Sequence, residues 1–202
     1  LTKIFKNGIT NNNLLPLLKK ICYYILGSGN KNPLKKSDSN FPYFITRDKE
    51  DSYNSSRMAW CYGDLGIGYA LLKASSILDD KYLESVSLEL LKRCSFRKME
   101  SNTQVKDAGL CHGAFGNYLI FENLAINNDI KNFQSTSNFW CSKALKIDKA
   151  SHDHDHFQYW NAQKGIWELN SSFLVGLAGI GLSLIKISNN SESKWTESLL
   201  ID

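Results

Sequence analysis

The sequence predicts an all-α fold built from helical hairpins, with inner and outer helices in two concentric layers. A Gly-x-x-Gly motif occurs three times, in Gly63–Gly68, Gly113–Gly116 and Gly176–Gly181. Each copy precedes a segment that is apolar on nearly every face, as expected of a helix buried on all sides. Other segments carry a narrower apolar stripe, which is typical of an outer helix with one solvated face. Because the copies start 50 and 63 residues apart, we interpret the chain as an imperfect repeat of two-helix units.

The first half of the chain contains three predicted helices. One covers residues 13–26, and Pro16 is compatible with it because proline is tolerated in a first helical turn. An inner helix is predicted at 65–78 and an outer helix at 83–94. The apolar stripe of the outer helix comprises Leu83, Val86, Leu90 and Cys94.

The second half continues the same alternation. Inner helices are predicted at 114–126 and 177–187, with an outer helix near 136–147 between them, and Trp195, Leu199 and Leu200 begin another. Glycine before each inner helix lets the backbone turn sharply and lets neighbouring helices approach closely. No strand is predicted. Long loops are expected at 28–57, 97–108 and 149–172, and loops of this length are often functional.

Composition excludes several classes of protein. The 202 residues are 43% apolar and 12% aromatic, which favours one globular domain over residues 1–202. A net charge of +4 is too small to predict nucleic-acid binding. The chain has no apolar stretch of membrane-spanning length and no secretion signal at its start, so we expect a cytoplasmic protein. Five scattered cysteines favour reduced thiols over a disulfide framework.

Cys61, Cys111 and His112 are the candidate metal ligands. They stand at the entrance of the first two glycine motifs, in Trp60–Gly63 and Cys111–Gly113. Thiolate and imidazole are ligand types that zinc prefers, and three protein ligands leave the open position typical of a catalytic zinc site. The third copy has Leu174 and Val175 in the equivalent place, so no ligand is expected there.

The ordered motifs of residues 57–187 resemble those of the lanthionine synthetase C-like family of lanthipeptide cyclases. The resemblance implies an α/α toroid, a double-layered ring of helical hairpins, of which this chain would supply about three to four. It also implies that Cys61, Cys111 and His112 bind Zn²⁺. The chain lacks a counterpart to the family's further active-site histidine and acidic residue, so it resembles the C-terminal portion of a cyclase, and inactivity without an N-terminal half stays an alternative.

The resemblance predicts that peptide cysteine thiols add to dehydroalanine or dehydrobutyrine to form thioether (lanthionine) rings. The implied partners are a dehydrated, ribosomally made precursor peptide, a lanthipeptide dehydratase and a transporter, with membrane association only through such a complex. Two alternatives stay open: a non-catalytic, zinc-stabilised helical module that binds the precursor or the dehydratase, and a protein that adds glutathione to dehydroamino acids. A glycosidase or terpenoid cyclase would need acidic clusters that this chain shows only in polar loops.

The remaining candidate residues are hypotheses from position alone. Tyr62, Asp64 and His154 are candidates for catalysis, and Arg57 and Trp60 are candidates for substrate binding. Each of these residues also has a purely structural interpretation. Tyr62 and Trp60 would pack beside the site, Asp64 would start an inner helix, and Arg57 would be an exposed charge. His152, His154 and His156 alternate along a polar loop without a partner of matching spacing, so no metal site is predicted there.

Overall fold

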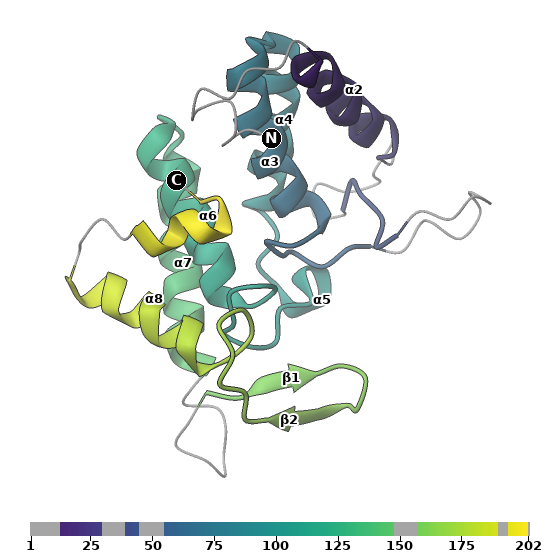
Figure 1. Ribbon diagram of the computed structural model, residues 1–202. Coiled ribbons are helices and arrows are strands. Elements are labelled where there is room, and N and C mark those ends of the chain that lie inside the picture. The colour runs from purple at the N-terminus through teal and green to yellow at the C-terminus, as the bar shows by residue number, and fades with distance from the viewer. Residues whose placement is uncertain (1–12, 30–38, 45–54, 148–156, 190–193, 202) are drawn as a thin grey trace. The chain divides into compact units, whose positions relative to one another are not determined.

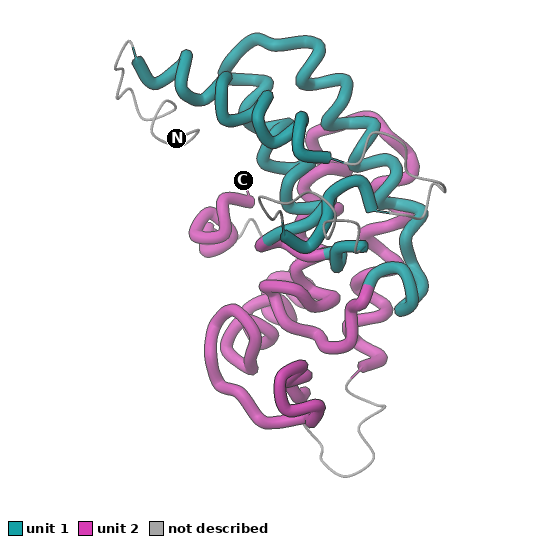
Figure 2. Tube along the Cα trace, turned by 90° about the vertical axis from the view of Figure 1, so that its right-hand side faces the viewer, with its two compact units in different colours: residues 1–58, 62–103 teal, residues 59–61, 104–202 magenta. Residues whose placement is uncertain are grey.

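The computed structural model describes residues 13–29, 39–44, 55–147, 157–189 and 194–201 (Figure 1). The chain divides into two compact units, which are described separately below (Figure 2). Unit 1 comprises residues 1–58 and 62–103, and unit 2 comprises residues 59–61 and 104–202. Among the described residues, no helix is both long enough and apolar enough to cross a membrane.

Unit 1 is helical, as predicted. It contains α2 (Leu14–Gly27), α3 (Gly63–Leu78), α4 (Lys81–Cys94) and the one-turn helix α5 (Glu100–Thr103). The predicted loop at 28–57 contains, in its described parts, only bends and an isolated bridge between Pro42 and Ser55. The predicted loop at 97–108 is interrupted by α5.

Helices α3 and α4 form a hairpin. Asp79 adopts a left-handed conformation with φ 48°, which ends α3. The side chain of Asp80 then accepts a hydrogen bond from the amide of Leu83 at 3.0 Å and so caps α4. The core of the unit joins Leu18 and Cys22 of α2 with Leu71 and Ala74 of α3 and Leu83 of α4.

Unit 2 contains helices and one small sheet. Its elements are α6 (Ala114–Asn127), α7 (Lys131–Ile147), β1 (Tyr159–Asn161), β2 (Ile166–Glu168), α8 (Leu177–Asn189) and the 3-10 helix η3 (Lys194–Leu199). Helices α6 and α7 pack side by side (Figure 1), with the rings of Phe121 and Phe133 6.0 Å apart. Every residue of α6 from Ala114 to Phe121 is buried, as expected of a helix covered on all sides, whereas Ile126 near its end is 74% exposed.

The prediction that the chain has no strand is wrong. Strands β1 and β2 pair antiparallel within the segment expected to be a loop, with Trp160 opposite Trp167. The turn between them closes through Asn161, whose carbonyl accepts the amide of Gly165 at 2.8 Å. Gly165 has φ +68°, a conformation that glycine adopts without steric cost. Three-residue strands are too short to show the alternation by which a strand is recognised from sequence.

The prediction of all-round burial is also wrong for α8. Its buried residues are Gly179, Ile180 and Ser183, whereas Leu177 is 38% exposed and Ile185 is 55% exposed. An apolar composition predicts burial only where another element covers the helix, and no described element covers this face. The bounds of α8 nevertheless agree with those expected.

Candidate metal centre

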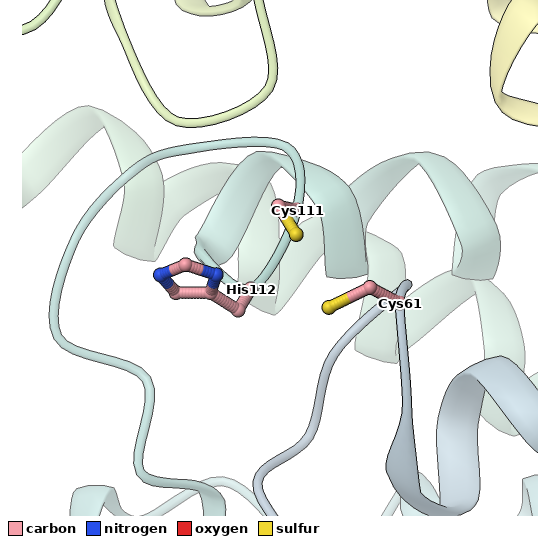
Figure 3. Close-up of side chains that lie close together, drawn as sticks. All are labelled: Cys61, Cys111 and His112. Carbon is pink, nitrogen blue, oxygen red and sulfur yellow. The ribbon is translucent and has the colours of Figure 1, made fainter.

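The three predicted ligands lie close together in unit 2. One ligand atom from each of Cys61, Cys111 and His112 lies within 4.8 Å of the other two. Figure 3 shows the side chains of Cys61, Cys111 and His112 close together on two separate loops, with one ring nitrogen of His112 on the side of the two sulfurs. Zn–S bonds of about 2.3 Å in a tetrahedral site place two sulfurs about 3.8 Å apart. The donor types and their mutual distances are therefore those of a group that could hold a metal ion.

A ladder of main-chain hydrogen bonds holds these loops side by side. The amides of Trp60 and Cys61 donate to the carbonyl oxygen of Cys111, at 3.0 and 3.4 Å. The amides of Leu110 and Cys111 donate in the same way to the carbonyl oxygen of Leu174, at 2.9 and 2.8 Å. Cys61, Cys111 and Leu174 each stand two residues before the first glycine of a motif. The same two amides and the same carbonyl oxygen therefore form the hydrogen bonds at both places.

Glycines make the close approach behind the ligands possible. A Cβ atom at Gly113 would lie 2.5 Å from Oδ1 of Asp107, a separation that real Cβ atoms do not show. A Cβ atom at Gly116 would lie 2.8 Å from the carbonyl carbon of Leu110 and closer still to its oxygen. Larger residues at either place would push the start of α6 away from the loop that bears Cys111.

Cys111 is activated by its neighbours. The pKa of its thiol falls from the ordinary value of 9.0 to about 5. The largest cause is a hydrogen bond from Cys61; His112 lowers the pKa further, while burial and the charge of Asp107 oppose the change. A thiolate at neutral pH is the form that both binds zinc and acts as a nucleophile. The arrangement therefore prepares Cys111 for metal binding.

Sequence reasoning missed two residues beside His112. Oδ2 of Asp107 lies 4.0 Å from Nε2 of His112, and the ring of Tyr159 packs edge-on at 6.1 Å between centroids. Tyr159 belongs to the unpredicted strand β1. The repeat contains a signal for Asp107. The equivalent residue of the third copy, 63 residues later, is Asn170, which has a similar short polar side chain.

The other candidates have contacts of their own. The indole Nε1 of Trp60 donates to the carbonyl oxygen of Leu199 at 2.7 Å, which favours a packing role for this side chain. In unit 1, the hydroxyl of Tyr62 donates to that of Tyr43 at 3.0 Å. Nε of Arg57 is buried and has no hydrogen-bond partner among the described residues, so Arg57 is not the fully exposed charge that the purely structural interpretation expects. His154 lies outside the described residues, as do His152 and His156.

Asp64 has a structural role in unit 1. Its side chain is 1% exposed and accepts hydrogen bonds from the amides of Asn40 and Phe41 at 2.8 to 3.0 Å. Arg97, itself fully buried, lies 3.4 Å from Oδ2. Burial raises the pKa of Asp64, and the two amides and Arg97 partly oppose the rise. These contacts hold the start of α3 against the loop at Asn40 and Phe41 and against Arg97 within unit 1.

Comparison with known proteins shows the family of the chain and a similar fold. The sequence model of the family described as "Lanthionine synthetase C-like protein" matches residues 3–200. Among solved structures, the fold is similar to that of "Nisin cyclase", with a TM-score of 0.70 and 21% sequence identity. The match covers 99% of this chain and 46% of the other. The chain thus spans about half the length of the solved protein that it resembles.

Proposed function

The chain belongs to the lanthionine synthetase C-like family, and from this premise we propose that it takes part in zinc-dependent lanthipeptide cyclisation. The reaction adds cysteine thiols of a dehydrated precursor peptide to dehydroalanine or dehydrobutyrine and closes thioether rings. The observation that carries the proposal is the convergence of Cys61, Cys111 and His112 within 4.8 Å of one another. Such a set of three fits catalysis better than structure because structural zinc sites usually have four protein ligands.

We also propose that the chain forms part of an α/α toroid, the fold that the resemblance to cyclases implies. The chain would supply about three to four helical hairpins of such a toroid. The similarity to part of the nisin cyclase structure supports this assignment, as do the equivalent main-chain hydrogen bonds from residues 60 and 61 to 111 and from residues 110 and 111 to 174.

The ligands have the chemistry that the reaction needs. Cys61 and Cys111 would bind as thiolates and His112 as a neutral imidazole, so the loaded site has no net charge. A zinc ion bound there would supply Lewis acidity that favours the deprotonated, nucleophilic form of a substrate thiol. The low pKa of Cys111 means that one ligand is already ionised at neutral pH.

The direct test measures metal and thiol together. The purified chain should contain one zinc per molecule and consume free thiol when it is incubated with a dehydrated precursor peptide that retains its cysteines. Mass stays unchanged on cyclisation, so thiol alkylation followed by mass spectrometry counts the rings. Full activity in zinc-free protein would contradict the proposal. Preferential consumption of added glutathione would instead assign the small-thiol reaction.

Matched variants separate the site from general effects of cysteine loss. Cys61→Ala and Cys111→Ala should each abolish stoichiometric zinc binding and ring formation. Cys141→Ser is the control, because Cys141 is a partly exposed cysteine of α7 outside the ligand trio. Equal loss of zinc in Cys141→Ser and Cys111→Ala would show that the trio is not the metal site.

A second candidate is a non-catalytic, zinc-stabilised module that binds the precursor peptide or the dehydratase. These 202 residues have no counterpart to the family's further active-site histidine, which favours this candidate. Zinc removal should unfold such a module, whereas a catalytic site should lose activity with its helices intact. Far-UV circular dichroism before and after chelation distinguishes the two.

A further inference from the structure

Building on the proposed metal centre, we propose that Asp107 is a positioning residue that holds the imidazole of His112 with Nε2–H toward its carboxylate and Nδ1 toward the metal. Either ring nitrogen of a histidine can bind a metal ion. The contacts of Asp107 favour binding through Nδ1 of His112.

The two carboxylate oxygens of Asp107 have different partners. The side chain is 3% exposed. Oδ1 accepts a hydrogen bond from the amide of Gly109 at 3.0 Å, which closes the turn before Cys111. Oδ2 accepts from the amide of Trp160 at 3.2 Å and lies 4.0 Å from Nε2 of His112. One oxygen thus shapes the ligand loop, and the other faces the ligand itself.

The third copy of the glycine motif shows which of these contacts the turn requires. Asn170, equivalent to Asp107, accepts from the amide of Ser172 through Oδ1 at 2.8 Å. Its carbonyl accepts from the amide of Leu177 at 2.8 Å, just as the carbonyl of Asp107 accepts from Ala114 at 2.9 Å. An amide side chain therefore suffices for the turn. The copy that bears Cys111 and His112 has a carboxylate instead, and its additional charged oxygen is the one that faces His112.

The ring of His112 is consistent with one orientation. Figure 3 shows one ring nitrogen on the side of the two sulfurs and the other pointing away from them. Since Nε2 is the nitrogen near Asp107, Nδ1 is the one nearer the cysteines. A neutral imidazole has one N–H and one lone pair, and a nearby carboxylate favours the tautomer whose N–H faces it. Tyr159 packs edge-on against the ring and limits its rotation.

Zinc affinity of the 202-residue chain tests the inference. Asp107→Asn keeps an oxygen for the amide of Gly109 but removes the charge beside His112, and it should weaken zinc binding by about 10- to 100-fold. Asn170→Ala is the matched control, because it removes the equivalent turn contact in the copy without ligands and should leave zinc affinity unchanged. Circular dichroism establishes that each variant is folded.

Three results would overturn the assignment. Wild-type zinc affinity in folded Asp107→Asn would show that the carboxylate does not position the ligand, and equal losses in both variants would show that the turn alone matters. A wild-type chain without zinc binding would overturn the proposed function as well, which distinguishes the two failures.

If Asp107→Asn does not fold, nuclear magnetic resonance of the wild-type chain decides. In ¹¹³Cd-loaded, ¹⁵N-labelled protein, the cadmium-coupled imidazole should bind through Nδ1 and show a slowly exchanging proton on Nε2. Cadmium coupled to Nε2 would refute the inference.

Discussion

Replacing Gly116 with alanine should destabilise unit 2 by driving α6 against the loop that bears Cys111. The new Cβ atom would lie 2.8 Å from the carbonyl carbon of Leu110, whereas ordinary contact begins at 3.4 Å. The helix and the loop must therefore separate by at least 0.6 Å (3.4 − 2.8), and by more at the carbonyl oxygen. Both partners are backbone, so no side-chain rotation relieves the clash.

The expected cost is about 3 kcal/mol, the upper part of the range for overpacked sites. For a chain of this size, about 2–4 °C per kcal/mol converts the cost to a melting temperature lower by roughly 6–12 °C. Thermal unfolding of the metal-free chain, followed by far-UV circular dichroism, measures it. Zinc affinity should fall as well, because the clash moves the peptide group that precedes Cys111.

Gly181→Ala is the matched control for this experiment. Gly181 is also a motif glycine near the start of a helix, but a Cβ atom there would meet nothing within 4 Å. Alanine is the better helix former, so this variant should be equal to or more stable than wild type by up to about 1 kcal/mol. A melting temperature of Gly116→Ala within about 2 °C of the wild-type value would refute the reasoning.

Three further predictions follow from buried and ionised groups. Arg97→Met leaves the carboxylate of Asp64 buried without its cation and should lower the free energy of unfolding by about 3–5 kcal/mol. The double variant with Asp64→Asn should lose less, and urea unfolding measures both values. Iodoacetamide at pH 6 should alkylate Cys111 in metal-free protein and spare Cys94, whose pKa burial raises; peptide mapping that finds Cys94 modified first would contradict this. Because the pKa of Cys111 is lower in the folded chain, the unfolded chain holds more protons between about pH 5 and 9. The melting temperature of the metal-free protein should therefore rise with pH across that window, and Cys111→Ser should flatten the rise.

The helices were predictable because local pattern determines them. Segments apolar on every face became α3 and α6, with bounds within two residues of those expected, and the striped segment became α4. The proximity of Cys61, Cys111 and His112 was predictable because the three residues stand at the entrances of repeated glycine motifs, in the order that resembles the lanthionine synthetase C-like family. The helices follow from patterns within a few neighbouring residues, whereas the trio follows from the repeat of motifs 50 residues apart.

The remaining features depend on contacts between distant segments. Asp107 matters because the amide of Trp160, 53 residues away, and the ring of His112 both meet one of its oxygens. The β1–β2 hairpin was missed because its strands are three residues long, although Asn161 and Gly165 signal its turn. The exposure of Ile185 depends on what covers α8, and no local pattern records that.

The main-chain hydrogen bonds of the ladder involve peptide groups alone. They connect Trp60 and Cys61 to Cys111, and Leu110 and Cys111 to Leu174. These hydrogen bonds therefore do not require cysteine at the third place, as leucine at position 174 illustrates. An apolar residue in place of Cys61 or Cys111 would leave these hydrogen bonds in place, so the thiols could be lost in evolution without loss of the contact between the loops. By the same logic, a protein engineer could install a thiol at position 174 as a new anchoring point with little risk to the scaffold.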